Sequence, residues 1–185
     1  MPTRRSRGNL VWIDLETTGL DPDHDVIVEI ATIVTDKELT VLEEGPDLVV
    51  RQPPEVWERV DPWVSKQHGA SGLIEASKQS AVSLVDAEAR TLESVKTHCP
   101  PKRCPLAGNS ICFDRRFLIR HMPTLEAYLD YRNVDVSSIK ELVRRWSPRL
   151  AAQMGKASRH RALDDIRESI EELRFYRQSV FRTVP

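Results

Sequence analysis

The sequence predicts one α/β domain in which a mixed β-sheet carries helices on both faces. Three observations support this fold class. Segments rich in β-branched residues follow one another near the N-terminus, whereas later short apolar segments alternate with segments of helical periodicity. The third is size, because 185 residues with 40% hydrophobic composition suffice for one substantial core.

The first half begins with a predicted three-stranded meander. Val11–Glu16 and Val26–Thr35 are rich in β-branched residues, and the same pattern is less clear in Val41–Val50. Glycine, Asp-Pro and Asp-Lys turn signals separate the three segments.

Two helices are expected next. Pro53–His68 shows helical spacing that Pro62 disturbs, with Trp57, Val60 and Val64 on one side. Ser80–His98 is a clearer helix, because five apolar residues follow the 3–4 spacing of one face. That predicted face consists of Val82, Val85, Ala89, Leu92 and Val95.

The second half supplies two more strands, giving five in all. Leu106–Gly108 is a short strand that leads into a helix containing Asp114, and Tyr131–Val136 is another strand. A helix over Ser137–Trp146, capped by Ser137 or Ser138, and a final helix over Ala162–Gln178 complete the pattern, with 147–159 expected as a loop.

Composition limits the environment and the substrate. No apolar run approaches the roughly 18 residues of a membrane span. Residues 1–8 form a basic segment that we expect to be a flexible tail, with a single domain over 9–181. The three cysteines are an odd number without a secretory signal, which favours reduced thiols and a cytoplasmic location. The net charge of −1 suits a substrate with few phosphates at least as well as a long polyanion.

A pair of acids on the first strand is the first candidate site. Side chains alternate along a strand, so Trp12, Asp14 and Glu16 point one way and the intervening apolar residues the other. Two acids two residues apart project side by side, as a shared metal requires. An ordinary strand with one wet face remains the alternative, although Asp is disfavoured in strands.

Asp114 is a second candidate. Projection at 100° per residue places it near the middle of an apolar arc made by Phe117, Leu118 and His121, with Arg115 and Arg116 outside that arc. A carboxylate on a core-facing stripe is costly unless it is paired or bound to a metal. The alternative is a carboxylate that only stabilises a helix N-terminus.

The last helix distinguishes two neighbouring aspartates. Asp164 points away from the apolar stripe, whereas Asp165 lies on its flank and is the preferred ligand. His160 converges with Asp165 only if it lies in the loop before the helix. Beside metal-bound water it would be a general base; otherwise it is a surface histidine in a basic loop.

These carboxylates indicate a metal-dependent nuclease. Hard oxygen ligands without cysteine select Mg²⁺ or Mn²⁺, and two such ions roughly 3.5–4 Å apart can clamp the attacking and leaving oxygens of a phosphodiester. Zinc bound by His98, Cys99 and Cys104 is a weaker alternative, because no CxxC pair supports it.

Together the motifs resemble the DEDDh branch of the ribonuclease H-like 3′-to-5′ exonucleases and, more narrowly, the oligoribonuclease family. The resemblance runs almost end to end. It rests on His68–Leu73, Gly108–Ser110, Asp114-Arg115, Met122-Pro123, Tyr131-Arg132, Asp135–Leu142 and His160–Leu163 through Glu168–Ile170.

The resemblance implies a role for each matching position. Asp14, Glu16, Asp114 and Asp165 would hold two divalent ions, Mg²⁺ or Mn²⁺, and His160 would activate water. Leu20 and Trp63 would sandwich the two bases, and His68, Arg132 and Ser137 would cap the 5′ phosphate. Tyr131, Arg132 and Ser137 would be supplied by the second subunit of a homodimer, and Ser110 is a further implied substrate-binding residue. The substrate would be a very short RNA, chiefly a dinucleotide, cleaved to nucleoside 5′-monophosphates.

Two alternatives stay open. Thr17 stands where oligoribonucleases commonly carry Met, and Thr is common in exonucleases that act on longer DNA or RNA. A catalytically silent nucleic-acid-binding module on this fold is the other alternative, but all five catalytic positions are filled.

Overall fold

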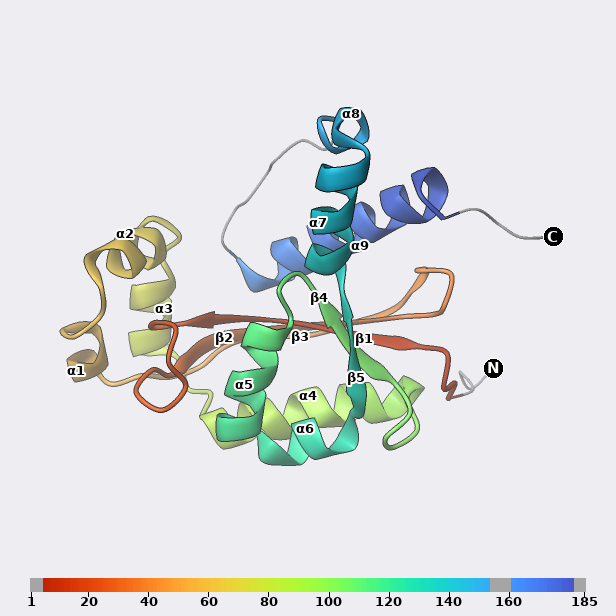
Figure 1. Ribbon diagram of the computed structural model, residues 1–185. Helices are drawn as coiled ribbons and strands as arrows, with labels where there is room; N and C mark the ends of the chain where they lie inside the picture. Colours follow the sequence, from red (N-terminus) through yellow and green to blue (C-terminus); the bar gives the residue numbers. More distant parts are fainter. Residues whose placement is uncertain (1–4, 154–160, 182–185) are drawn as a thin grey trace.

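The computed structural model describes residues 5–153 and 161–181. Its sheet has five strands in the order β3-β2-β1-β4-β5. The pairs β1–β2 and β2–β3 are antiparallel, and β1–β4 and β4–β5 are parallel. This mixed sheet with helices on both faces (Figure 1) confirms the predicted fold class.

The strands are β1 Leu10–Thr17, β2 Ile27–Thr35, β3 Val41–Val49, β4 Pro105–Gly108 and β5 Asp130–Asp135. The helices are α1 Pro54–Trp57, α2 Pro62–Ala70, α3 Leu73–Gln79, α4 Leu84–His98, α5 Cys112–His121, α6 Pro123–Tyr128, α7 Val136–Trp146, α8 Pro148–Ala151 and α9 Ala162–Ser179. No helix of the described ranges is both long and apolar enough to cross a membrane.

Two helical layers bury the two faces of the sheet. Figure 1 shows α4, α5 and α6 on one side and α7 and α9 on the other. Val11, Ile13 and Leu15 of β1 join the core under the first layer, whereas Trp12 joins the core under the second. The alternation predicted for β1 is therefore confirmed.

The second half of β1 has no strand on its β4 side. β1 pairs with β2 over its whole length but with β4 only at Val11 and Trp12. Since β4 ends at Gly108 and α5 follows closely, the free edge of β1 faces α5. The open edge lets a helix side chain reach the strand's backbone.

The helix predicted over Pro53–His68 is wrong as a single element. The chain forms α1 and α2 instead, separated before Pro62, because proline at the first helical position favours a new helix start. The carboxylate of Asp61 caps α2 by accepting a hydrogen bond from the Trp63 amide.

The apolar face predicted for Ser80–His98 is also partly wrong. Val85 is 73% exposed and Ala89 is exposed, whereas Ser94 and His98 are buried. These two polar side chains are buried because both hydrogen-bond to Glu43 of β3. Spacing alone cannot detect such a partner on a distant strand.

Two smaller expectations at helix starts are corrected. The cap of α7 is Asp135, whose carboxylate accepts from the Ser137 amide at 3.1 Å, rather than Ser137 or Ser138. Arg115 lies inside the protein and not outside the α5 arc, because its guanidinium donates to backbone oxygens of Asp130 and Arg132. In addition, a short helix, α8, occupies part of the stretch expected as a loop.

Candidate active site

Strand β1 presents the first two carboxylates on one face. Asp14 and Glu16 share the side of Trp12, opposite the apolar residues that fill the core under α4 and α5. Both side chains are largely withdrawn from solvent. A strand that is buried on both faces thus carries two acids toward α9.

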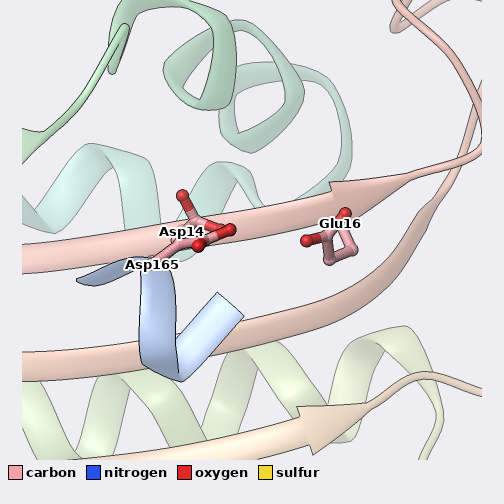
Figure 2. Close-up of side chains that lie close together, drawn as sticks. All are labelled: Asp14, Glu16 and Asp165. Atoms are coloured by element: carbon pink, nitrogen blue, oxygen red, sulfur yellow. The ribbon is translucent and has the colours of Figure 1, made fainter. Parts of the chain in front are cut away.

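Helix α9 brings a third carboxylate to this pair. One oxygen each of Asp14, Glu16 and Asp165 lie within 4.8 Å of one another. Figure 2 shows Asp165 reaching from α9 to Asp14, with Glu16 farther along the same strand. Asp164, by contrast, is partly exposed and pairs with Arg167 at 3.1 Å. The geometry agrees with the helix projection that preferred Asp165.

Asp114 approaches from the opposite layer. It is 4% exposed, and its Oδ1 accepts a hydrogen bond of 3.0 Å from the Leu15 amide, on the open edge of β1. It does not belong to the group of three oxygens within 4.8 Å. Its charge nevertheless acts on Asp14, which places it at the border of the same cluster.

Burial and mutual repulsion make these carboxylates hard to ionise. Desolvation by burial, followed by the charges of Asp114 and Glu16, raises the pKa of Asp14 well above its usual value. Burial, then the charge of Asp165, raises the pKa of Glu16 to about 8. Burial raises the pKa of Asp114 to about 7 against the lowering effect of its backbone hydrogen bonds. A cation among them would offset both burial and repulsion.

The donor set fits a divalent metal. All the ligands on offer are carboxylate oxygens, which hard cations prefer. Within the described ranges, Asp14, Glu16 and Asp165 form the one group found with ligand spacing. The zinc alternative gains no support, because the His98 ring lies against Glu43 at 2.7 Å.

The predicted general base lies outside the described residues. His160 falls in 154–160, so its role stays a prediction. The next residue, Arg161, is described, and its guanidinium binds the buried carboxylate of Glu29 on β2.

The two side chains predicted to sandwich bases are exposed. Leu20 is 76% and Trp63 is 62% exposed. The loop carrying Leu20 is held by Asp25, which accepts from Thr18 Oγ1 and from the Asp21 amide. Gly19 packs so closely on Asp25 that a Cβ there would lie 2.4 Å from its carboxylate.

His68 occupies an interior position beside Glu16. It is 3% exposed, its Nε2 lies 2.8 Å from the Thr17 carbonyl oxygen, and its Nδ1 lies 3.9 Å from Glu16 Oε2. Among the described atoms, Nδ1 has no hydrogen-bond partner.

The remaining predicted substrate residues lie around β5 and the start of α7. Tyr131 is 77% exposed and packs under the Arg132 guanidinium, 4.4 Å from the ring centroid. The Ser110 amide donates to Ser137 Oγ at 2.8 Å. Ser110 and Ser137 of the same chain are therefore in direct contact.

One charged pair near the cluster escaped sequence reasoning. Glu29 is fully buried and lies opposite Glu16 in the β1–β2 pairing. The sequence did contain a signal for this pair. Glu29 is the lone acid inside Ile27–Thr35, a strand otherwise composed of aliphatic residues and threonine, and a buried acid needs a buried partner. The sequence did not show that the partner, Arg161, follows at a separation of 132 residues.

Comparison with known protein families agrees with this geometry. Residues 11–173 match the exonuclease family of the RNase T type. An oligoribonuclease of Pseudomonas syringae pv. syringae is 58% identical over 174 residues, covering 94% of this chain and 97% of that protein. Oligoribonucleases of Pseudomonas aeruginosa PAO1 (91% of this chain, 94% of that protein) and Dichelobacter nodosus (95% and 96%) are each 56% identical.

Solved structures share the fold at much lower identity. Exonuclease I of Methylocaldum szegediense aligns with a TM-score of 0.70 at 22% identity over 93% of this chain. E. coli exonuclease I in complex with an oligonucleotide aligns with a TM-score of 0.69 at 16% identity over 96% of this chain. In both cases this chain spans 41% of the length of the matched chain, so these two structures support the fold alone. The family match, together with 58% identity over nearly the full length of both chains, establishes that this chain belongs to the oligoribonuclease family of exonucleases.

Proposed function

We propose that this protein is a 3′-to-5′ exoribonuclease that hydrolyses very short RNAs, chiefly dinucleotides, to nucleoside 5′-monophosphates. The observation that carries the proposal is the convergence of Asp14, Glu16 and Asp165 in a chain of the oligoribonuclease family. Carboxylates from β1 and α9 meet where burial and repulsion raise the pKa of Asp14 and Glu16, and a bound cation would offset both effects.

The proposed cofactors are two divalent ions, Mg²⁺ or Mn²⁺, held by Asp14, Glu16, Asp165 and Asp114. When bound, such ions stabilise the charge that develops on a phosphodiester and promote ionisation of water. The carboxylates of β1 and α9 would hold these ions at one place, and Asp114 keeps its position through the Leu15 amide. His160, in this proposal, accepts the proton of the attacking water at a ring nitrogen.

Substrate length is proposed to be set by the predicted substrate-binding residues around the cluster. Leu20 and Trp63 would sandwich two bases, since stacking on apolar and aromatic side chains tolerates any base. His68, Arg132 and Ser137 would enclose the 5′ phosphate, with Tyr131, Arg132 and Ser137 supplied by the second subunit of a cytoplasmic homodimer. Because Ser110 binds Ser137 within one chain, Ser110 would come from that same subunit.

An exonuclease for longer strands is the second candidate, favoured by Thr17. This residue is buried, and its Oγ1 donates to the Gly19 carbonyl beside Leu20. A closed 5′-phosphate pocket would obstruct a long strand, so substrate length distinguishes the two candidates.

The test is turnover of 5′-phosphorylated RNAs of two to seven nucleotides, with Mg²⁺ or Mn²⁺ and with chelator. We expect the dinucleotide to be cleaved fastest, chelator to stop cleavage, and the Asp165→Asn variant to be inactive. Equal cleavage of two- and seven-nucleotide RNAs would favour the second candidate. Absence of cleavage by the wild type at every length would favour a silent binding module.

A further inference from the structure

We infer that Glu29 and Arg161 form a positioning clamp that docks the start of α9 on the sheet and so places Asp165 on the metal site. This inference rests on the proposed metal site. It concerns a pair of residues beside the site, on β2 and directly before α9.

The contact between the two side chains is bidentate and half-buried. Glu29 is fully buried, and the Arg161 side chain is 40% exposed. Arg161 Nε lies 2.9 Å from Glu29 Oε1 and 3.2 Å from Oε2, and a terminal nitrogen lies 2.5 Å from Oε1. Such a fork fixes orientation as well as distance, because two parallel hydrogen bonds exclude rotation of either group.

Glu29 also caps the helix that carries Asp165. The Ala162 amide, at the first position of α9, donates to Glu29 Oε2 at 3.2 Å. The residue at the N-cap position, Arg161, provides no side-chain cap of its own. A carboxylate from a neighbouring strand therefore satisfies one of the free amides at this helix start, where negative charge is also favourable.

The clamp acts on the same helical turn as Asp165. Ala162 and Asp165 are three residues apart and so share one face of α9. The Asp165 amide donates to the Arg161 carbonyl at 3.0 Å, which closes this first turn. Fixing Arg161 and Ala162 on Glu29 thereby fixes where the Asp165 carboxylate meets Asp14 and Glu16.

Glu29 is a positioning residue and not a fourth ligand. Both of its oxygens accept hydrogen bonds from Arg161 or Ala162. It lies opposite Glu16 in the strand pairing, and its charge contributes to the rise in the pKa of Asp14 and of Glu16. The charge of Arg161 acts in the opposite direction on Glu16 and offsets part of this repulsion.

The test is Mn²⁺ binding measured by calorimetry on the full chain, with turnover of a dinucleotide as a second readout. Glu29→Gln keeps the shape of the side chain but removes the charge that holds the fork. We expect Mn²⁺ affinity and kcat each to fall by about 10- to 100-fold, the usual effect of losing a residue that orients a ligand. KM for the dinucleotide should change little, since Leu20 and Trp63, which are proposed to stack on the bases, are untouched.

Glu44→Gln is the matched control. Glu44 on β3 also pairs with an α9 arginine, Arg167, at 2.8 Å, but this pair is exposed and lies farther along the helix. It should leave Mn²⁺ affinity and kcat unchanged. If Glu29→Gln weakens Mn²⁺ binding no more than Glu44→Gln does, the clamp is refuted.

A double-mutant cycle separates positioning from a general loss of structure. In an Asp165→Asn background, Glu29→Gln should cause little further loss of Mn²⁺ affinity, because the side chain through which it acts is already altered. An undiminished loss in that background would refute action through Asp165. If the wild type itself binds no Mn²⁺, the proposed metal site fails together with the clamp; wild-type binding that Glu29→Gln leaves intact refutes the clamp alone.

Discussion

The carboxylate cluster and the predicted substrate rim are built in opposite ways. Asp14 and Glu16 lie on a strand paired along its length with β2, and Asp165 lies on a packed helix, so neighbours determine their positions. Leu20 and Trp63, in contrast, extend into solvent from a loop and from a nine-residue helix at the end of the sheet. The cluster carboxylates are therefore held within the packed interior, whereas Leu20 and Trp63 present most of their surface to solvent.

This difference predicts that the cluster governs the chemical step and that the exposed residues govern substrate binding. A buried cluster concentrates charge in a region of low dielectric, where each carboxylate strongly affects the others. Exposed apolar and aromatic side chains instead contribute by desolvation and stacking, which are modest for each residue. Substitutions in the cluster should therefore change kcat greatly, and substitutions in the rim should mainly change KM.

The largest expected effect is loss of a cluster carboxylate. Asp165→Asn removes a ligand charge, and we expect kcat to fall by about three orders of magnitude, since several kcal/mol of charge stabilisation depend on the bound ions. Steady-state turnover of a dinucleotide measures this effect.

The neighbouring aspartate provides the matched control. Asp164→Asn should be nearly silent, because its carboxylate pairs with Arg167 at the surface. If Asp164→Asn inactivates the enzyme while Asp165→Asn does not, the geometry of α9 assigned to the site is wrong.

The two regions also differ in how far the sequence alone predicts them. Strand alternation and helix projection predicted the faces on which Asp14, Glu16 and Asp165 lie, because period is a property of the local sequence. Trp63 was identified only through family resemblance, since nothing local distinguishes it from Trp146, another exposed tryptophan.

The errors share one physical cause. Arg115, Ser94 and His98 are buried because polar partners from other elements accept or share their hydrogen bonds. The buried Glu29–Arg161 pair was missed for the same reason. Local patterns report which face is apolar, but a polar residue inside the protein depends on a partner that is distant in the sequence.

The next effect tests whether the rim is completed by a second subunit. Arg132 is exposed, and its guanidinium stacks on Tyr131 without entering the cluster of its own chain. Arg132→Ala should weaken dinucleotide binding by about 1.5–3 kcal/mol, the usual worth of a charge-assisted hydrogen bond. Binding of dinucleotides with and without the 5′ phosphate should show that the loss requires the phosphate.

Subunit mixing tests the origin of Arg132 directly. A mixed dimer of Arg132→Ala and Asp114→Asn chains would contain one site with both residues intact. Partial recovery of activity after subunit exchange is expected, and no recovery despite demonstrated exchange would exclude the shared site.

A smaller effect is expected at the stacking residue. Trp63→Ala should raise KM for a dinucleotide by the equivalent of about 1–3 kcal/mol, because one base loses its stacking partner. Its effect on kcat should be slight. Trp146→Ala replaces another exposed tryptophan, at the end of α7, and should leave KM for the dinucleotide unchanged. A fall in kcat without a change in KM for Trp63→Ala would assign this tryptophan to the chemical step instead.

The smallest effect concerns stability without metal, and it contrasts the cluster with the surface once more. Burial and nearby carboxylates raise the pKa of Glu16 from 4.5 to about 8, and burial raises that of Asp114 from 3.8 to about 7. At any pH between the pKa of such a group in the unfolded state and its pKa in the folded state, the native state binds more protons than the unfolded state. The free energy of unfolding must therefore decrease as pH rises from about 4 to 8.

Thermal unfolding of the metal-free protein across this range measures the decrease. Glu16→Gln removes one of these groups, so it should flatten the pH dependence and raise the melting temperature at pH 8, while Asp164→Asn should leave the slope unchanged. Saturating Mg²⁺ or Mn²⁺ should reverse the trend in the wild type, because ligand carboxylates bind metal more tightly when ionised. A wild-type melting temperature that rises from pH 5 to 8 in chelator would show that the cluster does not carry the repulsion on which the metal site is argued.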